Sequence, residues 1–206
     1  MYEMRRTKEE AAQTRQTLLD AALELFSRQG YQATRLEDIA KAAGVTRGAI
    51  YHHFGGKAEL YKSLMEAASA QESGAVETAI SEGGSLPEIM TRILSYSLAL
   101  LEKDRRLRQI FELSLIRAGN DPDLEAVRNQ RLEQSEILIN STASIMAQGI
   151  IRGELRADLD PTTVARAFIA YQNGVATLWL SDRQAFSLKE KAAEFADVFM
   201  VGLLAR

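Results

Sequence analysis

The 206-residue chain has no cysteine, three prolines and 7% aromatic residues. The absence of cysteine excludes disulfides, thiolate nucleophiles, iron–sulfur clusters and cysteine-based zinc sites, and it is typical of a cytoplasmic protein. Long apolar runs are absent too: the most apolar stretch, residues 164–180, is interrupted by polar residues and is shorter than the ~20 residues of a membrane span. The start of the chain has basic residues without the apolar run of a secretory signal. We therefore expect a soluble cytoplasmic protein that does not enter a membrane.

Positive charge is scarce over the whole chain, whose formal net charge is −3, and this argues at first against a nucleic-acid partner. The charge is unevenly distributed, however. Residues 1–65 contain ten basic and eight acidic residues, a balance of +2, and the remaining residues have a balance of −5. The split predicts two regions with different partners, and we place them at residues 1–65 and 66–206.

Apolar residues follow helical spacing almost throughout, from the stripe that begins at Leu18 to the one that ends at Leu203, and no segment alternates with a period of two. The positions of proline and glycine also favour helices, because the prolines follow capping residues and the glycines end the apolar stripes. The predicted caps are Ser85 with Glu88, Asp121 before Pro122 and Asp160 before Pro161, and the predicted helix ends are Gly30, Gly119 and Gly153. The predicted fold is all-α, with about nine helices.

The most informative segment, residues 34–61, reads TRLEDIAKAAGVTRGAIYHHFGGKAELY. Thr34 and Glu37 form a predicted capping box, Gly44 ends that short helix, and Thr46 can cap a second helix. Two short helices joined at a glycine are the helix-turn-helix arrangement. The first residues of its second helix can enter the major groove of DNA, where Arg47 can donate two hydrogen bonds to a guanine edge.

Basic residues flank this segment. Arg5, Arg6 and Lys8 form an arm that can reach DNA or be a solvated tail, and Lys57 lies near a helix N-terminus that can hold a phosphate. Because helix pairs with a glycine turn are common in α proteins, the pattern alone leaves an alternative open. That alternative is a non-catalytic helical adaptor that binds protein partners.

Enzymatic patterns are not found. The two histidines, His52 and His53, are adjacent and point about 100° apart on a helix, so they form no His-x-x-x-His metal face. There is no glycine-rich phosphate loop and no nucleophile elbow. We predict a protein that is not an enzyme and has no metal and no cofactor.

The run from Ile39 through Gly44-Val45-Thr46-Arg47-Gly48-Ala49-Ile50-Tyr51 to Phe54, Lys57 and Leu60-Tyr61 resembles the DNA-binding region of the TetR family of transcriptional repressors. The segments VTRGAIY and RRTKEEAAQTR, with RGELRADLDPTTVARAFIAYQNGV later in the chain, resemble sequences of the branch of this family that represses multidrug efflux pumps. The resemblance implies that the bases are contacted by Thr46, Arg47 and Gly48, and the backbone phosphates by Thr34, Tyr51, His52 and Lys57. Efflux-repressor relatives often have tryptophan at the place of His52. For His53 we favour a partly buried ring near Phe54.

The resemblance also implies that residues 66–206 sense a ligand and form a homodimer through the last two helices. Such a dimer places two recognition helices one DNA turn apart, about 34–36 Å, on a near-palindromic operator of double-stranded DNA. The apolar stripes at residues 164–180 and 195–203 suit this role, although both can also be ordinary core. Predicted ligand-binding residues are Tyr96, Phe111, Leu115, Phe168, Gln172, Asn173 and Trp179. They favour a small apolar or aromatic effector; for the aromatic residues a core role is the alternative, and for Gln172 and Asn173 a hydrogen bond to a neighbouring backbone.

Overall fold

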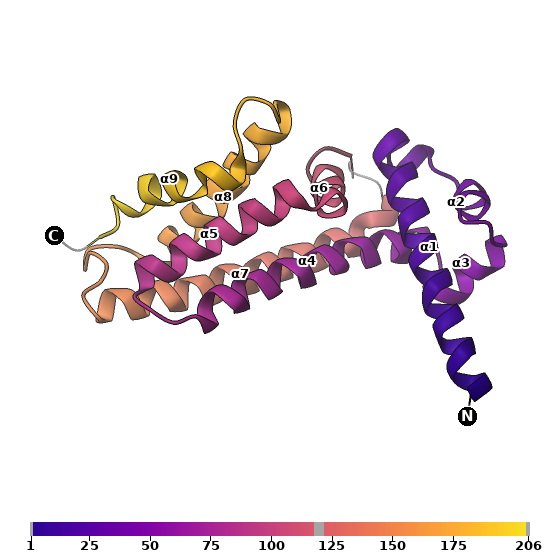
Figure 1. Ribbon diagram of the computed structural model, residues 1–206, viewed down its shortest axis with the longest axis horizontal. Coiled ribbons are helices and arrows are strands. Elements are labelled where there is room, and N and C mark those ends of the chain that lie inside the picture. Colours follow the sequence, from indigo (N-terminus) through magenta and orange to yellow (C-terminus); the bar gives the residue numbers. More distant parts are fainter. Residues whose placement is uncertain (1, 118–121, 205–206) are drawn as a thin grey trace. The chain divides into compact units, whose positions relative to one another are not determined.

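The structure is a computed structural model that describes residues 2–117 and 122–204 (Figure 1). These described residues contain nine α-helices and no β-strand, which confirms the predicted fold class and helix number. The α-helices are α1 (Tyr2–Ala33), α2 (Leu36–Ala42), α3 (Arg47–Phe54), α4 (Lys57–Ser81), α5 (Leu86–Lys103), α6 (Arg105–Glu112), α7 (Glu125–Ile151), α8 (Pro161–Ser181) and α9 (Leu188–Met200). A π-helical turn, η1 (Leu113–Arg117), and a 3-10 turn, η2 (Pro122–Leu124), lie between α6 and α7.

No helix in the described part of the chain is long and apolar enough to cross a membrane. Over the same residues, no group of three or more histidine or acidic side chains is arranged to hold a metal ion.

The chain forms two compact units, and the residues that belong to each do not follow a simple division at residue 65. The first unit comprises Met1–Ala70 and Arg106–Arg128, and the second comprises Gln71–Arg105 and Asn129–Arg206. α4 therefore runs across the predicted boundary. α6 joins the first unit because it is strongly amphipathic and buries Leu107 and Ile110, while its Arg106 Nη1 lies 2.9 Å from Asp20 Oδ1 on α1.

The core of the first unit is built around three aromatic rings. The ring centroids of Phe26 and Tyr31 lie 5.5 Å apart, those of Phe26 and Tyr61 5.9 Å, and those of Tyr31 and Tyr61 5.5 Å, at tilted or edge-on angles that aromatic pairs favour. Around them lie buried residues of α1–α4 together with residues from beyond α5, namely Ile110, Leu113, Leu124 and Val127. One continuous core thus supports α2 and α3.

The second unit contains α5, α8 and α9, and α5 packs mainly along α9 (Figure 1). Two predicted caps are confirmed here. Ser85 and Glu88 form the reciprocal capping box at the start of α5, and the Asp160 carboxylate accepts a hydrogen bond of 2.8 Å from the backbone N–H of Thr163 at the start of α8. α9 begins where the Glu102 carboxylate accepts a hydrogen bond of 2.6 Å from the Lys189 N–H.

The helix ends follow the glycines wherever the structure describes them. Gly30, with φ +82°, breaks the helical path near the end of α1, and Gly153, with φ +72°, follows α7. These backbone angles favour glycine because a Cβ is disfavoured there. The predicted helix end at Gly119 and the predicted cap at Asp121 lie outside the described residues.

Candidate nucleic-acid interface

The candidate site is built on α2, α3 and the turn between them. α2 ends at a glycine turn: Gly44 has φ +68°, and the Val45 N–H donates a 3.0 Å hydrogen bond to the Ala40 carbonyl. This hydrogen bond pairs a carbonyl at the end of α2. The chain then turns at Gly44, three residues before α3 begins at Arg47. Thr46 is the N-cap of α3, as predicted, but its side chain makes no capping hydrogen bond. The arrangement is a helix-turn-helix.

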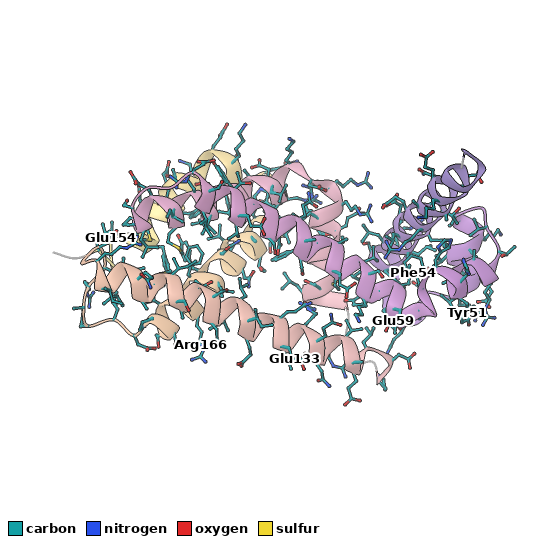
Figure 2. The ribbon with its side chains drawn as sticks, turned by 90° about the horizontal axis from the view of Figure 1, so that it is seen from below. Tyr51, Phe54, Glu59, Glu133, Glu154 and Arg166 are labelled. Atoms are coloured by element: carbon teal, nitrogen blue, oxygen red, sulfur yellow. The ribbon has the colours of Figure 1, made fainter. Side chains whose placement is uncertain are left out.

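α3 has a buried face and an exposed face. Ile50 and Phe54 are buried in the core of the first unit. The predicted base-contacting residues Thr46, Arg47 and Gly48 are all exposed at the N-terminal end of the helix. Figure 2 labels one residue of each face: Phe54 lies on the inner side of α3, and Tyr51, which is 45% exposed, lies on the outer side. The core therefore anchors α3 by one side and leaves its first turn accessible.

Arg47 is held by two neighbours. Its Nη1 lies 2.5 Å from Glu37 Oε1 on α2, and its Nη2 donates a 2.7 Å hydrogen bond to the Tyr51 hydroxyl. The guanidinium carbon also lies 5.3 Å from the centre of the Tyr51 ring. The hydrogen bond to Tyr51 and the charge of Glu37 raise the pKa of Arg47 above its ordinary value, so the Arg47 side chain stays a cation.

Lys57, at the start of α4, supplies a second cation close to this surface. Its Nζ lies 4.2 Å from the centre of the Tyr31 ring and donates a 3.3 Å hydrogen bond to the Gln32 carbonyl. Because Gln32 follows Gly30, the ammonium group is positioned by the end of α1 as well as by its own helix. A cation at a helix N-terminus suits a phosphate, which both the charge and the free N–H groups attract.

The predicted capping box of Thr34 and Glu37 is wrong. The N-cap of α2 is Arg35, and no side chain caps it. The Thr34 hydroxyl instead donates a 2.7 Å hydrogen bond to the Gly30 carbonyl at the break in α1, and Glu37 pairs with Arg47. Thr34 is only 1% exposed. Its side chain is turned away from the surface, and its phosphate contact stays a prediction.

The two histidines differ in exposure. His52 is exposed, as a phosphate contact requires, while His53 is partly buried with its ring 6.3 Å from that of Phe54. The packing role that we favoured for His53 is therefore confirmed. Burial lowers the pKa of His53, and the charges of His52 and Arg15 lower it further. Neutral His53 is thus the stable form near neutral pH.

The helix-turn-helix lies within a segment that a known protein family shares. The family described as "Bacterial regulatory proteins, tetR family" matches residues 18–64, which contain α2, α3 and the turn. The transcriptional regulator TtgR of Pseudomonas putida is 36% identical over 180 residues, covering 86% of this chain and 85% of TtgR. The chain belongs to the TetR family.

Solved structures of TetR-type proteins agree. NalD, described as the secondary repressor of the MexAB-OprM multidrug efflux pump in Pseudomonas aeruginosa, superimposes with a TM-score of 0.82 at 26% identity, over 95% of this chain and 98% of NalD. SmeT, solved as a complex with triclosan, has a TM-score of 0.78 at 25% identity, over 93% of this chain and 91% of SmeT. The chain is therefore a TetR-type transcriptional regulator, similar to efflux-pump repressors and not an enzyme.

In this TetR-type fold the predicted ligand-binding residues fall in both units. Phe111 on α6 and Leu115 in η1 belong to the first unit. In the second unit, Phe168 and Trp179 are buried side chains of α8, which fits the core alternative. Gln172 is half-buried and Asn173 is exposed on the same helix. Their role in ligand binding stays a prediction.

Tyr96 alone among them lines a groove of the second unit. The groove has a volume of about 610 Å³ and is lined by Ala75, Thr78, Tyr96, Ala99, Leu100, Glu102, Lys103 and Lys189. Its lining is mainly apolar, with the lysines as its cationic residues. The Tyr96 hydroxyl donates a 2.8 Å hydrogen bond to Glu82 Oε1, and this bond raises the pKa of Tyr96.

Sequence reasoning missed two residues near the recognition helix. Glu37 was interpreted as a cap, although it pairs with a residue ten positions away on another helix. Arg15 of α1 was not selected, yet its exposed guanidinium lies 4.9 Å from the centre of the Phe54 ring and donates a 3.3 Å hydrogen bond to the Ser63 hydroxyl. No local spacing could have identified either contact, because each joins different helices.

Proposed function

We propose that the protein is a homodimeric repressor that binds a near-palindromic operator and is released by a small hydrophobic effector. The observation that carries the proposal is the exposed first turn of α3, where Arg47 stands on a helix anchored by Ile50 and Phe54. Guanidinium groups in this position donate two hydrogen bonds to guanine. The similarity to NalD favours repression of an efflux pump over the adaptor alternative.

In this proposal Arg47 reads bases and Lys57 binds a phosphate, so their substitutions have different effects. Arg47→Ala should relax discrimination at one base pair by about 1–3 kcal/mol. Lys57→Ala should weaken binding to all sequences and lower the slope of log affinity against log salt by about one.

The measurement begins with a footprint on the DNA that flanks the gene of this protein. Binding of the wild type and of both variants is then titrated on that site and on a scrambled duplex, at several salt concentrations. Lys62→Ala, on the same helix as Lys57 but paired with Glu59 and Glu66, serves as the control. Unchanged DNA affinity in both Arg47→Ala and Lys57→Ala would refute the site.

Exposed apolar residues on α8 and α9 support the homodimer. Leu178 of α8 is 69% exposed, Val198 of α9 is 72% exposed, and Val201 just beyond α9 is 73% exposed. Large side chains exposed together on two neighbouring helices are typical of a surface that a partner covers. Two helices from each copy make a four-helix bundle. We expect Leu178→Glu to yield monomers in light scattering. Leu132 is also exposed but lies on α7, so Leu132→Glu should leave the dimer intact.

The effector site that the structure favours is the groove at Tyr96. Its volume of about 610 Å³ lies within the range of small-molecule pockets, about 300–1,000 Å³, and its lining is mainly apolar, as such pockets usually are. α4 links this groove to the DNA surface, because it carries Ala75 and Thr78 at one end and Lys57 at the other. Effector binding that favours one state of α4 then weakens DNA binding, and DNA weakens effector binding equally.

Two variants test the location of the effector site. Thr78→Phe fills the groove, and Asn173→Leu alters the predicted polar group of α8. A panel of apolar compounds is titrated against the preformed DNA complex of each variant. Loss of effector response in Thr78→Phe, with operator affinity retained, supports the groove, and a loss confined to Asn173→Leu supports α8 instead. An equal loss of operator affinity and effector response indicates misfolding.

A further inference from the structure

The ion pair between Glu37 and Arg47 is an unexpected feature of a DNA-binding surface. It places a carboxylate 2.5 Å from the guanidinium that the proposed function assigns to base contact. Both side chains are about half exposed, at 55% and 54%. Exposed pairs of this kind contribute little to folding, and a carboxylate close to DNA repels the phosphates. Neither stability nor general DNA affinity explains the presence of Glu37.

The geometry of Arg47 offers another explanation. A guanidinium has five N–H donors. One is directed to Glu37 and one to Tyr51, which leaves three for a partner. Arg47 can therefore donate two hydrogen bonds to a neutral guanine edge while both existing contacts are kept. The contacts come from two helices and from two ends of the same planar group, so they restrict the rotation of the side chain before DNA arrives.

The charge of the pair acts differently on phosphates and on bases. Glu37 compensates the charge of Arg47, and this removes most of the attraction of the pair to a phosphate, whereas the donors needed for a base edge remain. On random DNA, a phosphate that approaches Arg47 also meets the negative charge of Glu37, which repels it. We infer that Glu37 is a positioning residue for sequence specificity: it holds Arg47 for base contact and suppresses its contact with phosphates. This inference rests on the proposed base contact of Arg47.

The test compares Glu37→Gln with a control of the same charge change, Asp38→Asn, one residue further along α2, where the carboxylate is also exposed. Affinities are measured for the footprinted operator and for a scrambled duplex over a range of NaCl concentrations. In Glu37→Gln we expect scrambled DNA to bind about tenfold more tightly and with a salt slope about one unit steeper, because Arg47 gains a phosphate. Operator affinity should rise less, so the ratio of the two affinities falls. Asp38→Asn should change both affinities by the same factor.

A double variant separates an effect through Arg47 from a direct effect of Glu37. If Glu37 acts through Arg47, adding Glu37→Gln to Arg47→Ala leaves the affinity ratio unchanged. An equal fall of the ratio in both backgrounds, or an unchanged ratio in Glu37→Gln alone, would overturn the inference. If Arg47→Ala relaxes discrimination and Glu37→Gln does not, the proposed function stands and only this inference fails. If the wild type does not prefer its operator, both fail.

Discussion

Truncation of Ile110 on α6 tests whether residues 106–128 contribute to the stability of the first unit. Its side chain is 3% exposed and lies in the same core cluster as Phe26, Tyr31 and Tyr61. Ile110→Ala removes three buried carbons, which at about 0.8 kcal/mol each corresponds to about 2.4 kcal/mol of transfer free energy. The cavity that remains raises the expected loss to about 3 kcal/mol, within the ~2–5 kcal/mol typical of such truncations.

The assay is native-state hydrogen exchange, which resolves the opening of each unit. A loss of about 3 kcal/mol speeds exchange about 100-fold, because each 1.4 kcal/mol is a factor of ten. We expect this acceleration in the amides of α1 and α3 and not in those of α8. The matched control is Leu94→Ala on α5, where a fully buried side chain of the second unit loses the same number of carbons. Trp179, the single tryptophan, reports the second unit by fluorescence.

The two variants should therefore give a crossed pattern, each affecting its own unit. Unchanged protection of α1 and α3 in Ile110→Ala, with faster exchange in α8, would refute the assignment of α6 to the first unit. Equal acceleration of all helices in both variants would show that the two units open together and that the division has no energetic meaning.

Three further substitutions probe local features. A Cβ on Gly149 would clash with Leu86 Cδ2, so Gly149→Ala should lower stability in thermal unfolding by about 1–3 kcal/mol, with partial recovery when Leu86→Ala is added. Gly55 has φ +80° and open space around a Cβ, so Gly55→Ala should cost about 1–2 kcal/mol through the backbone alone, and adding Leu86→Ala should give no recovery. Hydrogen bonds from Thr163 lower the pKa of Asp160, so its contribution is present above the ordinary carboxyl pKa and is lost as pH falls through the lower folded value. Asp160→Asn should therefore lose less stability than the wild type between about pH 5 and pH 2, and identical profiles would contradict this.

Local patterns explain which caps could be predicted from the sequence. The caps at Ser85 and Asp160 formed because each pairs with a group three residues ahead on its own helix. The same spacing at Thr34 and Glu37 failed. There the break at Gly30 offers a carbonyl to the Thr34 hydroxyl, and Arg47 offers a cation to Glu37. A sequence window shows the local partner and not its distant competitors.

The same limit applies to α6 and to the ligand-binding residues. Helical spacing indicates that Leu107 and Ile110 share an apolar face, but it does not say which core that face enters. α3 was easier to predict, because the sequence of the turn before it and of its first residues is specific to the family. The groove at Tyr96 combines residues of α4, α5 and the start of α9. No spacing in the sequence brings those three segments together.

The charge of the chain acquires a different meaning once Arg47 and Glu37 are seen as a pair. Residues 1–65 have an excess of only two positive charges, and this balance already counts Glu37 against Arg47. We therefore expect little counterion release on random DNA, with weak binding and a small salt dependence. A regulator of this kind has to gain most of its operator affinity from base contacts and from two simultaneous half-sites. Loss of the dimer in Leu178→Glu should therefore reduce operator binding far more than binding to scrambled DNA.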